Sequence, residues 1–162
     1  MPDLVLRSDL LSPEPEKILE FTGNHPSRLL KEMPDLIRET FRIEGTKIFE
    51  DQIKWDRSVE PIEFYGIWRG KDKKDARSTV WVKITIQGEQ STKDSTGHAK
   101  VRLTGWLQTK IPFTTQLHKF ITLVNLRFFY NEQKRKYIEE GMIRIGRLED
   151  EIRSLFELMR KE

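Results

Sequence analysis

The chain has 162 residues, of which 36% are hydrophobic and 34% are charged, and its formal net charge at pH 7 is +3. This length and apolar content predict one domain with a hydrophobic core, spanning residues 1–162. The most apolar run, residues 121–130, is interrupted by Asn125 and Arg127 and is shorter than the about 20 apolar residues that cross a membrane. The absence of cysteine excludes disulfides and cysteine nucleophiles and favours a cytoplasmic location.

The first 45 residues predict a strand followed by two short helices. Residues 4–7 form the strand. Residues 12–16 read Ser-Pro-Glu-Pro-Glu, which predicts the start of a helix, because Ser caps, Pro fits the first turn and Glu favours the positive helix end. This first helix is expected to end at Gly23. A second helix begins near Pro26 and carries an apolar face toward Gly45, with a break or kink expected at Pro34.

From Thr46 onward, apolar and polar residues alternate in four segments. The segments are 46–55, 62–69, 79–86 and 101–108, and polar loops separate them. Period-two alternation is typical of strands that bury one face. Four consecutive strands of this kind predict an antiparallel meander with one buried and one wetter face.

The C-terminal third predicts a long helix that covers the buried face of the meander. Residues 120–130 fit either a helix or a last strand, and we favour a helix because no turn signal separates them from 131–140. The fold class is therefore α+β, an antiparallel β meander gripping a long C-terminal helix, with two short helices after the first strand. The stripe of the long helix, at spacings of three and four, consists of Ile138, Gly141, Ile145, Leu148, Ile152, Leu155 and Met159.

This order of elements resembles the helix-grip fold of the START lipid-transfer domains, polyketide cyclases and birch-pollen-allergen proteins. The stretch from His25-Pro26-Ser27 to Met33-Pro34-Asp35 is similar to the second-helix region of polyketide-cyclase-like members. The resemblance implies a cavity between the sheet and the C-terminal helix that often holds a lipid or another apolar molecule. It implies no shared catalytic motif. Five strands are evident in this sequence, whereas the family usually has six or seven.

We therefore predict that the chain binds an apolar small molecule or lipid in this cavity, without catalysis and without a cofactor. No metal site is expected, because the three histidines are isolated in the sequence. Three inward-facing glycines, at 66, 105 and 141, either leave volume for a ligand or allow strands to bend and the helix to approach closely. An open cavity would accept a leucine at Gly141. The residues predicted to line the ligand site are Phe64, Trp68, Ile84, Leu103, Gly141 and Ile145.

Two other functions remain open. Residues 113–130 are rich in Phe and aliphatic residues, and an exposed patch there would mark a protein partner or a membrane surface. A cyclase-like or hydrolase-like enzyme would use Asp51, Tyr65 or Tyr137 as its acid–base group, but no nucleophile–base pair supports it. Strict alternation places Asp51 on the inward face, beside Phe49 and Ile53. The oligomeric state is not predicted.

The wetter face of the predicted meander combines aromatic and basic side chains. Such a combination binds single-stranded nucleic acid, whereas cross-strand aromatic pairs also stabilise sheets without a ligand. The net charge of +3 is small for a nucleic-acid-binding protein, so the nucleic-acid signal is not strong. The residues concerned are Tyr65, Arg69, Trp81, Lys83, Arg102 and Trp106.

Overall fold

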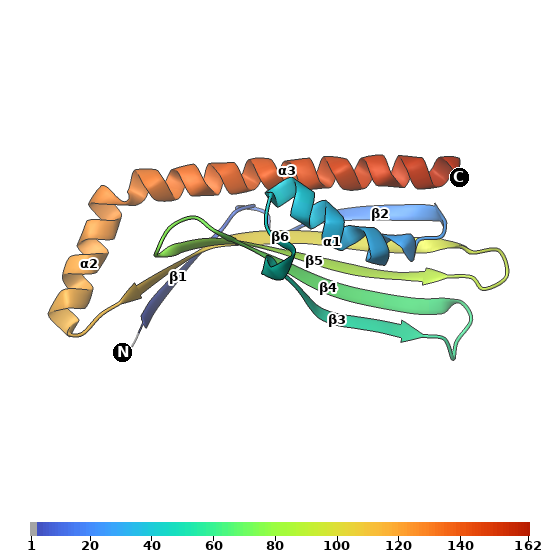
Figure 1. Ribbon diagram of the computed structural model, residues 1–162, viewed down its shortest axis with the longest axis horizontal. Helices are drawn as coiled ribbons and strands as arrows, with labels where there is room; N and C mark the ends of the chain where they lie inside the picture. Colours follow the sequence, from blue (N-terminus) through green and yellow to red (C-terminus); the bar gives the residue numbers. More distant parts are fainter. Residues whose placement is uncertain (1–2) are drawn as a thin grey trace.

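The computed structural model describes residues 3–162, which form a six-stranded antiparallel sheet with helices on one face (Figure 1). The fold class is α+β, as predicted. The elements in chain order are β1 (Asp3–Asp9), β2 (Lys17–Asn24), α1 (Arg28–Phe41), the 3-10 turn η1 (Gly45–Lys47), β3 (Ile48–Asp56), β4 (Ile62–Lys73), β5 (Ser78–Gln90), β6 (Thr96–Pro112), α2 (Gln116–Phe129) and α3 (Asn131–Lys161).

The sheet is organised around β6, which is 17 residues long. The strand order is β1-β6-β5-β4-β3, so the predicted meander of β3 to β6 is confirmed. β1 pairs with residues 106–112 of β6, and β2 pairs with residues 96–103 of the same strand. β1 and β2 therefore lie end to end along one edge of β6.

The helix predicted over residues 12–24 is wrong, because this stretch contains β2. Leu19 and Phe21 face the core, whereas Ile18, Glu20 and Thr22 face outward. The period is thus two, and the Ser-Pro-Glu-Pro-Glu segment forms turns and bends before the strand. Pairing with the free half of β6 satisfies the backbone groups of β2, and this tertiary pairing overrides the local capping signal.

Helix α1 runs through Pro34 without the predicted break. Proline at this position removes one helical hydrogen bond. Burial of the apolar face compensates for that loss, since each buried large side chain contributes about 1.5–3 kcal/mol. The helix ends at Arg42, whose φ of 53° is left-handed and whose N–H donates to the Arg38 carbonyl. Its buried residues are Leu29, Leu30, Met33, Ile37 and Phe41.

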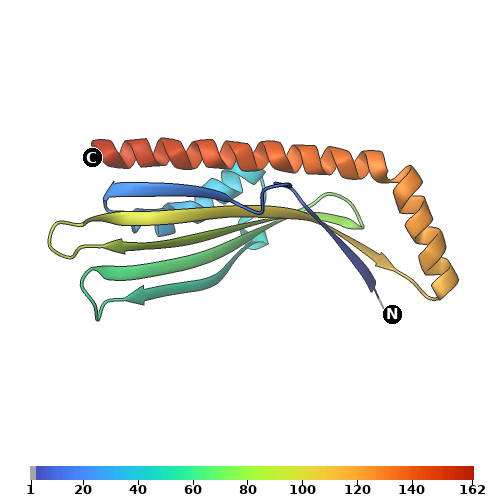
Figure 2. The same cartoon turned by 180° about the vertical axis from the view of Figure 1, so that it is seen from behind.

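α1 and α3 cover the same face of the sheet, and α2 turns away from it (Figures 1 and 2). The prediction of a helix over 120–130 is confirmed. However, the chain bends sharply at Tyr130, where α2 ends and α3 begins. The predicted stripe of α3 is largely confirmed, with Phe156 buried in place of Leu155, which is only partly buried.

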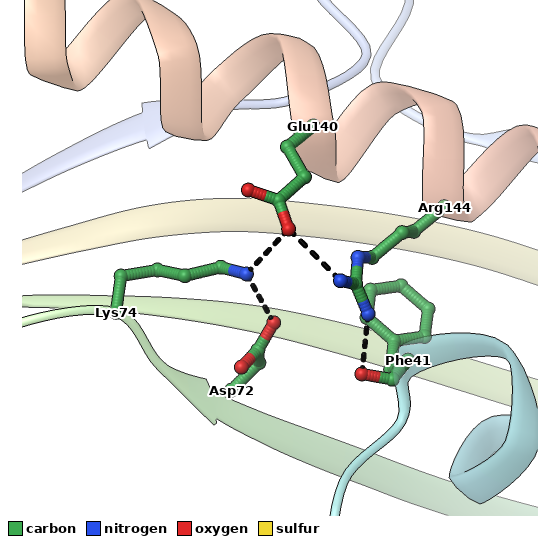
Figure 3. A network of polar contacts seen from close by, with 5 residues as sticks. All are labelled: Phe41, Asp72, Lys74, Glu140 and Arg144. Atoms are coloured by element: carbon green, nitrogen blue, oxygen red, sulfur yellow. Dashed lines mark hydrogen bonds and ion pairs between the residues drawn. The ribbon is translucent and has the colours of Figure 1, made fainter.

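A network of charges attaches α3 to α1 and β4 (Figure 3). Glu140 on α3 accepts from Lys74 and from Arg144, each at 2.9 Å. Arg144 also donates to the Phe41 carbonyl at the end of α1, at 2.5 Å. Lys74 Nζ lies 2.7 Å from Asp72 Oδ2, a buried oxygen that lacks a well-aligned hydrogen bond. Each charge has an opposite partner, so this network is structural.

We expect Arg144→Met to lower the free energy of unfolding by about 1–2 kcal/mol, because it removes the side-chain donor to the Phe41 carbonyl and one of the two donors to Glu140. Arg153→Met is the matched control, since Arg153 also pairs with a glutamate four residues earlier but its side chain is 60% exposed. Loss of that exposed pair should cost less than about 0.5 kcal/mol. Urea unfolding of both variants checks this difference, and equal losses would contradict it.

Candidate functional site

The structure brings the residues predicted to line a ligand cavity together in the core. Gly141 is buried on α3, and the other five side chains are at most 2% exposed. They lie on three neighbouring strands and on α3, as the period-two and helical patterns predicted. These five are Phe64 and Trp68 on β4, Ile84 on β5, Leu103 on β6 and Ile145 on α3.

Side chains occupy the space beside the three inward glycines. A Cβ atom at Gly141 would lie 2.8 Å from Leu10 Cδ1, and one at Gly105 would lie 2.6 Å from Ile145 Cδ1 and 2.9 Å from Leu10 Cδ1. A Cβ at Gly66 would lie 2.4 Å from the Trp68 ring. These distances favour the close-packing explanation of the glycines. Leu10, between β1 and β2, is 1% exposed; sequence reasoning missed it because a lone leucine in a connection has no periodicity.

Asp51, considered above as an acid–base residue, lies at a β-bulge on the outward face of the sheet. The register between β3 and β4 shifts between Glu50 and Gln52, and strict alternation therefore placed Asp51 on the wrong face. Its carboxylate accepts from Arg69 Nε at 2.6 Å and from Arg69 Nη2 at 3.0 Å. The hydrogen bond from Arg69 to Asp51 raises the pKa of Arg69. A carboxylate paired in this way stabilises the sheet rather than acting as a free base.

An aspartate–tyrosine cluster ties the β4–β5 hairpin to the bend between α2 and α3. Asp75 Oδ2 accepts from the Tyr130 hydroxyl at 2.6 Å and from the Tyr137 hydroxyl at 3.0 Å. Asp75 Oδ1 accepts from the backbone N–H groups of Arg77 and Ser78, both at 2.8 Å. The Ser78 hydroxyl is a further hydrogen-bond partner of Tyr130. The cluster fixes the direction in which α2 leaves α3.

Burial and hydrogen bonding set the pKa values of this cluster. Burial, followed by the hydrogen bond to Asp75, raises the pKa of Tyr130 to about 12. Burial raises the pKa of Asp75, but the hydrogen bonds from Tyr130, the two backbone N–H groups and Tyr137 together bring it below its ordinary value. Tyr130 is therefore a neutral donor and Asp75 a charged acceptor at neutral pH. Tyr137, another acid–base candidate, is occupied by the same contact.

Helix α2 is apolar and exposed, and none of its residues is buried. Phe120, Phe128 and Phe129 are 64%, 71% and 81% exposed. The apolar segment noted at 113–130 thus coincides with an apolar surface on a helix that has no buried residue. The other exposed large apolar side chains of α2 are Leu117, Ile121, Leu123 and Val124.

The charges within α2, and in the chain that leads to it from β6, are basic. No Asp or Glu occurs from residue 95 to residue 131, and the basic residues of this stretch are Lys100, Arg102, Lys110, Lys119 and Arg127. The nearest acid in the sheet register is Asp3, which pairs with Pro112. Within residues 3–162, no helix combines the length and the apolar character needed to cross a membrane. The apolar surface of α2 is therefore combined with the positive charges of Lys119 and Arg127.

A groove of 410 Å³ separates α2 from the β1–β6 end of the sheet. Leu6 and Thr109 form the sheet side of this groove, and the helical side combines two leucines of α2 with a tyrosine and three polar or charged residues. Two cations lie at its rim. The helical residues of the groove are Leu123, Leu126, Arg127, Tyr130, Asn131 and Lys134.

The outward face of the sheet carries the predicted aromatic and basic residues, and no helix of the described chain covers it. In Figure 2, α1 lies behind the sheet. Trp81 and Trp106 are directly opposite each other on β5 and β6, and their rings stack at 6.2 Å with an interplanar angle of 14°. Phe49 adds a third ring 6.1 Å from Trp81. Sequence reasoning missed Phe49, which it had placed on the inward face.

A second hollow, of 760 Å³, lies at the end of the sheet farthest from α2. The outward-facing side chains that line it carry both signs of charge. Glu63 and Glu89 are directly opposite each other on neighbouring strands, and Lys54, Lys100 and other polar residues lie beside them. Among residues 3–162 there is no group of His, Asp and Glu side chains that could hold a metal ion. This hollow has no arrangement that points to a particular chemistry.

Comparisons with known proteins give no functional assignment. No protein-family model and no curated protein matches the sequence. A solved protein of unknown function from Staphylococcus aureus is 10% identical, with a TM-score of 0.28, over 99% of this chain and 98% of that chain. An uncharacterized protein from Rhizobium leguminosarum is 8% identical, with a TM-score of 0.20, over 91% and 99% of the two chains. Likenesses at this level carry no argument about function.

Proposed function

We propose that the chain attaches to the surface of an anionic membrane through α2. The observation that supports this proposal is the exposure of the apolar residues of α2 on a helix whose own charges, Lys119 and Arg127, are both basic. Helices that lie in a membrane interface combine an apolar side, buried among the headgroups and upper acyl chains, with lysine and arginine. Lys119 and Arg127 occupy such positions on α2.

The energies of such a contact are sufficient for reversible binding. Transfer of a phenylalanine or leucine side chain out of water contributes about 1.5–3 kcal/mol, and a lysine or arginine at an anionic surface contributes about 1 kcal/mol. Phe120 and Phe128 lie on one stripe of α2, eight residues apart, with Val124 midway between them. The Asp75 cluster holds α2 away from the sheet, so this stripe is free to meet a flat surface.

Charge distinguishes a membrane from a second copy of the chain as the partner of α2. In an isologous dimer through α2, Lys119 and Arg127 of both copies would approach each other, and α2 itself contributes no acid to pair with them. Like charges in a desolvated interface are unfavourable. An anionic lipid surface supplies the complementary charge.

The test is co-sedimentation with vesicles of phosphatidylserine and phosphatidylcholine, compared with phosphatidylcholine alone. We expect binding to the anionic vesicles and at least tenfold weaker binding by the Phe120→Glu/Phe128→Glu double variant. Leu158→Glu is the control, because Leu158 is 49% exposed in the last turn of α3, and that end of α3 lies far from α2 (Figure 1). No binding by the parent, or an equal loss in the control, would contradict the proposal. A dimer in light scattering that the double variant dissociates would assign α2 to self-association instead.

Binding of an apolar small molecule or lipid in a helix-grip domain is the second candidate function, and the 410 Å³ groove beside α2 favours it. Its volume is within the range of about 300–1,000 Å³ typical of ligand sites. The helix-grip assignment is supported by the meander and the long C-terminal helix. Native mass spectrometry after incubation with oleate tests this candidate, with Leu126→Arg expected to abolish the bound species. The absence of any adduct on the parent would remove it.

A further inference from the structure

We propose that the outward face of the sheet binds single-stranded nucleic acid. The site consists of the rings of Phe49, Trp81 and Trp106, with the basic side chains that surround them. It lies on different elements from α2, so this inference does not depend on the membrane proposal.

The aromatic part of the site is a continuous platform across three strands. Phe49, Trp81 and Trp106 lie on β3, β5 and β6, with centroid distances of 6.1 and 6.2 Å between successive rings. Trp81 Nε1 donates to Gln108 at 2.9 Å, which fixes the orientation of the central ring. Stacking of bases on such rings is tolerant of sequence, because every base has a flat π-face.

The basic part of the site follows β4. Arg69, Lys71 and Lys73 occupy alternate positions on the outward side of this strand, so they recur about every 6.7 Å. The Arg69 guanidinium lies 5.2 Å from the Trp81 ring and Lys71 Nζ lies 5.7 Å from it. A row of cations beside a row of rings matches the two parts of a single strand, its phosphates and its bases.

Arg7 on the edge strand β1 extends this arrangement. Its guanidinium stacks 4.1 Å from the centre of the Trp106 ring, yet its side chain remains 59% exposed and its contact with Asp9 is long, at 4.0 Å. An exposed arginine on an aromatic ring can move aside and stack on the other face of an incoming base. Arg7 thus covers the platform only until a base arrives.

The charge distribution favours this end of the face over the other. Near the platform, Asp51 and Asp9 are offset by Arg7, Arg69, Lys71, Lys73 and Lys83. Toward the far hairpins, the carboxylates of Asp56, Glu63 and Glu89 occupy neighbouring positions of one row. A polyanion is therefore attracted to the aromatic half and repelled by the distal row.

The test is fluorescence anisotropy with labelled oligouridylate, and with inorganic polyphosphate as a competitor without bases. We expect oligouridylate to bind at low salt and Trp106→Ala to weaken this binding by about tenfold. Lys71→Gln should reduce the slope of the logarithm of the binding constant against the logarithm of the salt concentration by about 0.7. Lys71→Gln changes only a partly exposed surface charge, so it keeps the test valid if Trp106→Ala unfolds.

The controls are Trp55→Ala, which removes a tryptophan that is 44% exposed and faces away from the platform, and Lys31→Gln on α1. Both should leave oligouridylate binding unchanged. The proposal is overturned by no binding of oligouridylate, by equal losses in the controls, or by polyphosphate competing as well as unlabelled oligouridylate. The Phe120→Glu/Phe128→Glu variant should bind oligouridylate normally, which separates this site from α2.

Discussion

Asp75→Ala is expected to lower the free energy of unfolding by about 2–3 kcal/mol at neutral pH. The substitution removes the acceptor of four hydrogen bonds, two from tyrosine hydroxyls and two from backbone N–H groups. A buried donor left without an acceptor costs about 1–3 kcal/mol. The cost is smaller for part-buried donors, because water can replace the lost acceptor. Chemical denaturation monitored by far-UV circular dichroism measures the change.

Asp94→Ala is the matched control for this prediction. Asp94 also accepts hydrogen bonds within a hairpin, from the N–H and hydroxyl of Thr96 at 3.1 and 2.7 Å, but it is exposed and ties no second element. We expect a loss below about 1 kcal/mol. An equal loss in the two variants would contradict the role of Asp75 as a tie between hairpin and helices.

The stabilisation by Asp75 should depend on pH with a definite sign. Its hydrogen bonds bring the folded-state pKa below the ordinary value, which is about 3.9 in an unfolded chain. The contribution is therefore complete above that pH and is lost as the pH falls through the folded-state pKa. The stability difference between the parent and Asp75→Ala should narrow below about pH 4, and a difference that grows on acidification would contradict this assignment.

Gly141→Leu is expected to lower the free energy of unfolding by about 1–2 kcal/mol. Leu10 is in the way, since a Cβ atom at position 141 would already be 2.8 Å from Leu10 Cδ1. Overpacking of this kind costs about 1–3 kcal/mol, and the better helix propensity of leucine offsets up to about 1 kcal/mol. The sequence-based expectation for an open cavity was that a leucine at position 141 would be accepted without loss of stability.

Gly146→Ala provides the control on the same helix. Gly146 has no side chain or foreign backbone within 4 Å of its would-be Cβ, so only helix propensity changes and stability should rise by about 1 kcal/mol. Thermal melts of the two variants check these opposite signs. Retained stability in Gly141→Leu would indicate that Leu10 yields and that the space under α3 can open.

The sequence predicted the parts of the fold whose pattern is long and regular. Alternation over eight or more residues identified β3 to β6, and a stripe from Gly141 to Met159 identified α3. β2 could not be recognised, because its eight residues follow a capping signal, and only pairing with the free half of β6 decides their conformation. The bend at Tyr130 depends on a hydrogen bond to Asp75, which is 55 positions away in the sequence. The residues around Tyr130 therefore contain no local pattern that predicts the bend.

The candidate sites were predicted to different extents. The apolar segment 113–130 and the rings of Trp81 and Trp106 follow from composition and alternation. The occupant of the space beside Gly141 does not, since Leu10 reaches it from a connection without periodicity. The β-bulge at Asp51 reversed the faces expected for Phe49 and Asp51, because one extra residue shifts the alternation of a strand.

Labelling of one residue on α2 tests the central claim most directly. The chain has no cysteine, so Phe128→Cys carries a polarity-sensitive fluorophore at a single known position. With phosphatidylserine-containing vesicles, we expect the emission of this label to shift to shorter wavelength, because the label leaves water for the lipid interface. A label at Leu158→Cys should not shift. Unchanged emission at position 128, or an equal shift at both positions, would contradict attachment through α2.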